Sequence, residues 1–279
     1  MKSLPATMEV KAMLNLTILR QDWRQNRRLW LAFAVLMLLC GGAILTLYDP
    51  VQGLKDTTLL DSMPGSLVKG FGIDLQDNSL TGFIASYLFG ICYLVIPLLY
   101  TLILANRLVA APVQSGMMSY YLAAPEKRSS VIVAKAYLLC SSLFGLFLIV
   151  GLAEFFLCQI LYPAELEIPQ YLLLWVGAFC VHLCLGGIVF VISCICDEVK
   201  TSAMIGVGLT LLFLLFCLLG RMGGGLEILS YATPFSLFCP LRLLMGETEL
   251  YWKLPTAGIS GIVLCWLGGK LFEKKDLPL

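Results

Sequence analysis

The stretch FIASYLFGICYLVIPLLYTLIL, residues 83–104, contains no charged side chain. A helix of about 20 apolar residues is long enough to cross the hydrocarbon core of a bilayer. Because that core holds no water, every backbone N–H and C=O group in it must be bonded within the protein, as it is in a helix. The stretch therefore predicts a transmembrane helix.

Five further apolar runs resemble this one and are set off from it by charged residues, proline or glycine. Hydrophobic residues make up 59% of the 279-residue chain and charged residues 13%, which is about half the charged share of a soluble domain. A soluble fold of this size could not bury so much apolar surface. We therefore predict an all-α integral membrane protein with six transmembrane helices, at residues 29–48, 83–104, 136–162, 171–196, 203–219 and 254–272.

The cationic residues are divided unequally between the two sides that six helices define. Both ends of the chain and the segment between the second and third helices are rich in lysine and arginine. Under the positive-inside rule this places both termini in the cytoplasm, and we expect a multi-pass protein of a cell membrane, specifically a bacterial plasma membrane. The opposite side receives five of the nineteen basic residues, namely Lys55, Lys69, Arg221, Arg242 and Lys253.

We divide the chain into two parts. Residues 1–28 form a cytoplasmic amphipathic elbow helix, in which Leu16, Leu19 and Trp23 lie near one face and arginines surround it; such a helix lies in the headgroup layer. Residues 29–279 form one transmembrane domain with outer loops 49–82 and 220–253 and a cytoplasmic coupling loop, 105–135. The loop 220–253 is unusually apolar, which predicts short re-entrant or interfacial helices.

Several classes of function lack their motifs in this sequence. There is no GxxxxGK[ST] phosphate loop, no HExxH and no GxSxG, so we expect no enzyme activity and no nucleotide site in this chain. The eleven cysteines lie mostly in apolar runs without zinc-site spacing, which predicts free thiols and no metal site. A net charge of +1 gives no indication of nucleic-acid binding.

Two ionisable residues lie inside the predicted spans, where polar groups are costly and often functional. Glu154 lies in the third helix, and His182, the single histidine, in the fourth. They are candidates for a substrate or polar intramembrane contact. The alternative is a structural hydrogen bond, and the spacing does not place the two on one face.

The longest cytoplasmic segment between helices, residues 106–135, reads NRLVAAPVQSGMMSYYLAAPEKRSSVIVAK. A turn at residues 114–116 precedes a short predicted helix that exposes Met117, Met118, Tyr120 and Tyr121 and stops before Pro125. Methionine and tyrosine on a surface are typical of a partner-docking site. The alternative, that the segment lies on the inner leaflet, stays open.

In this segment the chain resembles the permease subunit of type-2 ABC exporters. Gly116, Leu122, Pro125, Arg128 and Lys135 stand at positions of that family's pattern. The chain departs from the pattern just upstream, where the family usually carries acidic residues. Weaker similarities occur in order along the chain, at residues 24–30, 62–72, 233–247 and 272–277.

The resemblance implies a half-transporter. Two permeases, identical or related, would pair with two separate ATPase subunits, which would bind ATP and Mg; this chain would hold no cofactor. The complex would move a lipophilic or amphipathic substrate, such as a peptide antibiotic, a drug or a lipid, out of the cytoplasm or inner leaflet. The implied ATPase-coupling residues are Gln114, Ser115, Gly116, Met117, Tyr120, Tyr121, Pro125, Glu126, Lys127 and Arg128.

Two alternatives from other classes remain. One is a membrane scaffold or immunity protein without transport, which needs no ATPase. The other is an intramembrane enzyme, for which Glu154 and His182 are the available ionisable pair.

Overall fold

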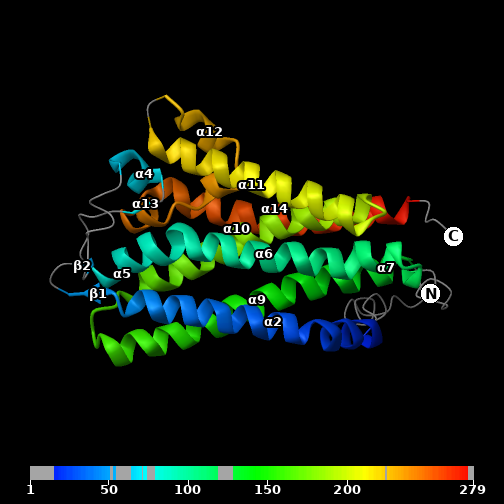
Figure 1. The fold of residues 1–279 in the computed structure, drawn as a ribbon, viewed down its shortest axis with the longest axis horizontal. Coiled ribbons are helices and arrows are strands. Elements are labelled where there is room, and N and C mark those ends of the chain that lie inside the picture. The colour runs from blue at the N-terminus through cyan, green and yellow to red at the C-terminus, as the bar shows by residue number, and fades with distance from the viewer. Residues whose placement is uncertain are drawn as a thin grey trace, which may run out of the picture.

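The fold is an elongated bundle of helices (Figure 1). The structure is a computed structural model, and it describes residues 16–50, 53–54, 64–70, 72–73, 79–118, 128–223 and 225–275. Six helical segments in these residues are long and apolar enough to cross a membrane, which confirms the all-α, six-helix prediction. They are Thr17–Leu45, Leu80–Gln114, Arg128–Leu161, Ile168–Ile195, Val199–Met222 and Thr248–Glu273.

Five of the six spans each correspond to one α-helix. These are α2 (Leu16–Leu45), α9 (Arg128–Leu161), α10 (Ile168–Ile195), α11 (Val199–Met222) and α14 (Thr248–Glu273). The second span is a series of shorter pieces that follow one another without a break: α5 (Leu80–Phe83), η1 (Ile84–Cys92), α6 (Tyr93–Ala105), η2 (Asn106–Ala110) and α7 (Ala111–Gln114). The pieces η1 and η2 have the wider π-helical hydrogen bonding.

Short elements collect at the end of the bundle away from α7 (Figure 1). The strands β1 (Tyr48–Asp49) and β2 (Gly53–Leu54) pair antiparallel, Tyr48 opposite Leu54. Near them lie α4 (Gly65–Gly70), α12 (Glu227–Tyr231), the 3-10 helix η3 (Pro234–Leu237) and α13 (Pro240–Leu244). The last three confirm the prediction of short helices between the fifth and sixth spans.

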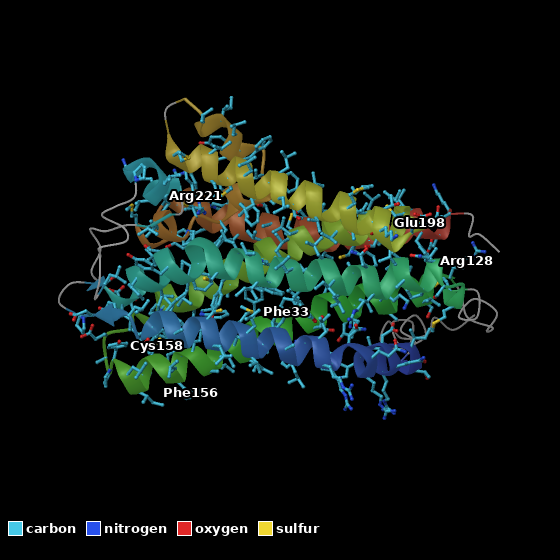
Figure 2. The ribbon with its side chains drawn as sticks, in the orientation of Figure 1. Phe33, Arg128, Phe156, Cys158, Glu198 and Arg221 are labelled. Atoms are coloured by element: carbon cyan, nitrogen blue, oxygen red, sulfur yellow. The ribbon has the colours of Figure 1, made fainter. Side chains whose placement is uncertain are left out.

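The start of α2 and the end of α14 lie at the same end of the bundle as α7 (Figure 1). An even number of crossings produces this arrangement. The side chains drawn in Figure 2 separate the two ends in the same way: Arg128 and Glu198 lie at the α7 end, and Arg221 lies beside α4.

The second span and α10 form the interior of the bundle. In their most apolar windows 71% and 67% of the residues are buried, against 22–39% in the other four spans. The outer spans present large apolar side chains outward, such as Phe156, Met204 and Trp266. Phe156 marks that outward face on α9 in Figure 2. Exposure of this kind suits contact with lipid.

Helices α10 and α14 make the closest contact in the bundle. A Cβ atom built on Gly187 would lie 2.7 Å from the carbonyl oxygen of Gly261, and one built on Gly261 would lie 2.5 Å from the backbone of Leu183. Small residues permit such close approach in membranes, where helices associate through packing. The same crossing includes Gly258 beside Cys180 and Gly268 beside Phe190.

The structure gives the helix bounds near two of the predicted boundaries. The elbow helix and the first span are joined in one helix, α2, because residues 16–28 carry no proline or glycine that would break it; residues 1–15 lie outside the described residues. Helix also occupies both ends of the predicted coupling loop, 105–135. The second span continues to Gln114 and α9 begins at Arg128, since a helix can extend past its apolar run and hydropathy alone does not fix its ends.

All eleven cysteines are free thiols, as expected from their apolar surroundings, and each is buried or half-buried. Cys140 of α9 and Cys265 of α14 lie with their Sγ atoms 4.0 Å apart. The thiols therefore serve as small apolar packing groups.

Replacement of Gly261 by alanine tests the crossing of α10 and α14. We expect the Gly261→Ala variant to unfold more easily by about 1–3 kcal/mol, because its methyl group would overlap the backbone of α10. The matched control is Gly208→Ala in α11, where a Cβ meets nothing within 4 Å; it should be neutral or stabilising by up to about 1 kcal/mol. Unfolding in mixed detergent micelles measures both, and equal stability of the two variants would contradict the packing argument.

Candidate functional site at the α7 end of the bundle

The predicted coupling segment begins at the end of α7, which is fastened to the start of α11. The side-chain oxygen Oε1 of Gln114 accepts a hydrogen bond of 2.8 Å from the backbone N–H of Val199. This N–H belongs to the first turn of α11, where backbone donors have no partner within the helix. Gln114 thus caps a helix that lies 85 residues further along the chain.

The chain turns sharply after Gln114. Gly116 has φ +72°, a left-handed conformation that glycine adopts readily and other residues rarely do. The N–H of Ser115 donates to the carbonyl of Ala111 and that of Gly116 to Val113. The predicted turn at residues 114–116 therefore has the geometry of a helix end.

The two methionines after the turn differ from each other. Met117 is exposed, as predicted, but Met118 is 1% exposed and packs in the core, because adjacent residues on a helix point in different directions. The prediction that both are exposed is wrong for Met118. Tyr120, Tyr121, Pro125, Glu126 and Lys127 lie outside the described residues.

The end of α14 is fastened to the end of α10. The ammonium group of Lys275 donates to the carbonyl oxygens of Cys194, Ile195 and Cys196 at 3.2, 2.9 and 2.8 Å and lies 2.8 Å from a carboxylate oxygen of Asp197. A cation there complements the negative end of the α10 dipole.

Two other residues, Cys196 and Arg128, lie close enough to Lys275 to interact with it. Burial raises the pKa of the Cys196 thiol against the opposing effect of Lys275, which keeps the thiol protonated near neutral pH. Arg128, the first residue of α9, approaches the carbonyl oxygen of Lys275 with its Nη1 atom at 3.5 Å. The predicted coupling residue Arg128 therefore adjoins the junction of α10 and α14.

A buried ion pair joins α2 to α9. The Nζ atom of Lys135 lies 3.0 Å from Oδ2 of Asp22, and the two side chains are 0% and 6% exposed. The role of Asp22 was not predicted from the sequence. The available signal was its isolation, because it is the single acidic residue among the arginines of residues 20–28.

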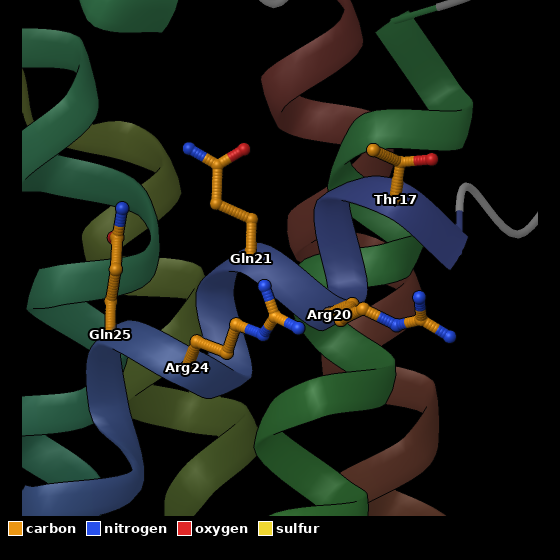
Figure 3. Close-up of a pocket in the computed structure, with 5 residues that line it drawn as sticks. All are labelled: Thr17, Arg20, Gln21, Arg24 and Gln25. Carbon is orange, nitrogen blue, oxygen red and sulfur yellow. The ribbon is translucent and has the colours of Figure 1, made fainter.

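The opposite face of α2 is open and basic. Thr17, Arg20, Gln21, Arg24 and Gln25 line a groove of about 590 Å³, and their side chains extend from the first turns of the helix (Figure 3). In that view these turns cross the direction of the green α9 ribbon. A basic face on an exposed side of a helix end suits the anionic surface of a membrane.

The predicted intramembrane residue Glu154 is enclosed within the bundle. It is 1% exposed, and its Oε1 atom has no hydrogen-bond partner within the described part of the chain. Its carboxyl group fills the space that Gly41 of α2 leaves open, beside the hydroxyl of Tyr93. That hydroxyl donates to the carbonyl of Met37 at 3.1 Å. Three helices therefore meet around the carboxyl group.

His182 is held elsewhere, by backbone groups. Its Nδ1 atom lies 2.7 Å from the carbonyl oxygen of Ala178 and its Nε2 atom 3.1 Å from that of Leu94. A neutral imidazole has one N–H, so it can hydrogen-bond to one of these carbonyls, whereas the doubly protonated ring bonds to both. Glu154 and His182 form no hydrogen bond with each other, and the structure does not bring them together as a pair.

Within the described residues no group of three or more histidine, cysteine or acidic side chains could hold a metal ion. At the α7 end, polar contacts instead connect several of the helices to one another. Gln114 contacts α11, Arg128 and Lys275 join α9 and α14 to α10, and Asp22 contacts Lys135. Gln114 therefore connects the turn after α7 to α11, while the other contacts connect α9 and α14 to α10 and α2 to α9.

Removal of one member of the buried ion pair should destabilise the bundle. We expect Asp22→Asn to cost about 3–5 kcal/mol, because it leaves the charge of Lys135 buried without its carboxylate. The double variant Asp22→Asn/Lys135→Met should cost less than the sum of the two single changes. Glu273→Gln, in the exposed pair with Lys270, is the control and should cost at most about 1 kcal/mol. Additive effects in a double-mutant cycle of unfolding would exclude the coupling.

Comparison with known proteins agrees with this architecture. The family model described as ABC-2 family transporter protein matches residues 16–249. No curated protein matches the chain. The matched region includes five of the six spans completely, both members of the buried ion pair and the turn at Gly116. Since it covers more than half of the chain, this protein belongs to the ABC-2 family of membrane transporter proteins.

Proposed function

We propose that the chain is the permease subunit of an ATP-driven exporter and that residues 114–128 dock on a separate ATPase. Two copies, or one copy and a related permease, would pair with two ATPases in a bacterial plasma membrane with both termini in the cytoplasm. The observation that carries the proposal is the attachment of Gln114 to the first turn of α11. Through it, movement of the docking segment is passed directly to another span.

The surroundings of the segment support the same role. Met117 is 44% exposed and lies directly after a turn whose conformation Gly116 fixes. Arg128 lies beside the carbonyl of Lys275, which in turn caps α10. An ATPase that pulls on both ends of the segment would thus act on α10, α11 and α14. ATP and Mg would be bound by that partner.

We propose a lipophilic or amphipathic substrate, such as a peptide antibiotic, a drug or a lipid. In support, α9 and α10 line an open apolar groove of about 360 Å³. Its walls include Phe144, Phe155, Tyr171 and Trp175, and aromatic walls of this kind suit apolar ligands. Glu154 lies on the same helix and is the nearest candidate for a polar contact when the bundle opens.

The coupling proposal is tested by co-purification with the cognate ATPase in detergent. Met117→Asp and Arg128→Glu should each reduce the retained ATPase by about tenfold, since one charge change at a small interface costs about 1–2 kcal/mol. The matched control is Ile228→Asp, at an exposed apolar residue at the other end of the bundle. If the wild-type chain neither retains nor stimulates an ATPase, the permease proposal fails and the scaffold or immunity function is favoured.

The role of Glu154 is tested separately, by transport in membrane vesicles. Glu154→Gln keeps the size of the side chain and removes its ability to ionise. We expect transport to fall by about tenfold or more, if the carboxylate contacts substrate in the transport cycle, while assembly with the ATPase is unchanged. Tyr93→Phe, which removes the neighbouring hydroxyl and leaves the carboxyl, is the comparison. Wild-type transport by Glu154→Gln would leave Glu154 a structural role only.

A further inference from the structure

At the end opposite α7, one pocket gathers cations from four separate parts of the chain. Lys69 of α4, Arg221 of α11, Arg242 of α13 and Lys253 of α14 all line a cavity of about 430 Å³. These are four of the five basic residues that the positive-inside rule places on the side opposite the cytoplasm. Membrane topology alone would place these basic residues on one side of the membrane but would not bring them into one pocket.

Two of the four cations have no ion-pair partner among the residues that the structure describes. Arg242 forms a two-pronged ion pair with Glu247, with its Nη2 atom 2.8 Å from a carboxylate oxygen, and Lys253 lies 3.1 Å from Glu249. Arg221 and Lys69, in contrast, form no ion pair and no hydrogen bond to a carbonyl group within the described residues. Capping of α4 and α11 therefore does not account for them.

The floor of the pocket is shaped around Arg221. Gly72 has φ +73°, and a Cβ atom built on it would lie 2.9 Å from Nη1 of Arg221. The guanidinium group thus lies directly over the glycine backbone, with Ser236 and Tyr231 among the other lining residues. None of the described residues that line the pocket is acidic. Guanidinium, ammonium and hydroxyl groups together form the donor set that binds phosphate oxygens.

Exposed apolar side chains line part of the pocket. Tyr231 and Met245, which line the pocket, are 72% and 71% exposed, and Ile228 and Trp252 nearby in the chain are 76% and 78% exposed. Tryptophan and tyrosine are enriched where a membrane meets water. A mouth of this kind suits an anion that carries an apolar portion better than it suits an inorganic ion.

We propose that this pocket, lined by Lys69, Arg221, Arg242 and Lys253, binds the phosphate of an anionic amphiphile at the membrane surface opposite the α7 end. The guanidinium of Arg221 and the ammonium of Lys69 contact the phosphate oxygens, and the exposed apolar side chains contact the apolar portion. The site does not depend on an ATPase partner and stands or falls independently of the transport proposal.

The test measures lipid binding by the purified full-length chain in dodecyl maltoside. The probe is dioleoyl phosphatidylglycerol, the reference is dioleoyl phosphatidylcholine, and bound lipid is counted by native mass spectrometry. We expect the wild type to prefer phosphatidylglycerol and the Lys69→Gln/Arg221→Gln variant to bind it about tenfold or more weakly, the effect of losing charge-assisted hydrogen bonds. Equal binding of both lipids by the wild type would overturn the proposal, as would unchanged binding by the variant.

Two controls separate charge from folding. Lys69→Arg/Arg221→Lys keeps both charges and should retain the preference, whereas Lys270→Gln changes an exposed cation of α14 near the α7 end and should have no effect. If the glutamine variant does not fold, the salt dependence of the wild type decides. Binding must weaken between about 50 mM and about 500 mM NaCl, because salt screens charge pairs, and salt-independent binding contradicts the proposal.

A competition arm identifies the source of the phosphate. Displacement of phosphatidylglycerol by inorganic phosphate would mean that the pocket recognises the anion alone, free or lipid-borne. Failure of inorganic phosphate to compete, with the lipid preference intact, would mean that the exposed apolar side chains are required and that the ligand is a lipid or a similar amphiphile. Both results support a phosphate site at Arg221.

Discussion

The contact of α10 with α14 at Gly187 and Gly261 determines the positions of both ends of the bundle. Because the backbones touch, α14 follows α10 closely along its length. At one end this brings Lys275 onto the last carbonyls of α10. At the other end it brings Lys253 and the preceding α13 to the pocket that also contains Arg221. A side chain at either glycine would separate the helices and disturb both places.

Polar groups inside the bundle follow a second constraint, which is that a bilayer offers them no water. His182 meets it by donating an N–H to one of the two backbone carbonyls beside its ring, and Lys135 with the carboxylate of Asp22. Three buried side-chain atoms do not meet it within the described residues, namely Asn106 Oδ1, Glu154 Oε1 and Trp175 Nε1. Glu154 is the ionisable one of the three, and a fold that leaves such a group unsatisfied in a hydrocarbon environment has either a structural cost or a use for the group in another conformation.

Hydropathy and charge predicted much of this fold, since length and apolarity are properties of each helix alone. The six spans and the short helices after α11 could be predicted for that reason. The unbroken run from the second span to Gln114 and the early start of α9 could not, because interfacial turns are too polar for hydropathy to register. The burial of Met118 depends on the direction of one side chain after a turn at Gly116, which composition does not determine.

The pairing of residues far apart in sequence was also beyond prediction. Asp22 and Lys135 are separated by 113 positions, and neither local sequence indicates which residue the other pairs with. Gln114 was assigned to the coupling segment through resemblance alone, and its contact with Val199 gives that residue a physical role. The four cations of the pocket were counted by side in the sequence, but their convergence depends on how α4, α11, α13 and α14 pack.

The native cysteines can report on helix separation through the reactivity of their thiol groups. All eleven are free, and none is fully exposed. Six of them, on α9, α10, α11 and α14 or just after α10, are buried between helices. A water-soluble thiol reagent therefore finds no fully open target in this conformation, and its reaction rate would follow the separation of helices. The rate of thiol modification in the unaltered chain can thus measure how fast the bundle opens, without any introduced label.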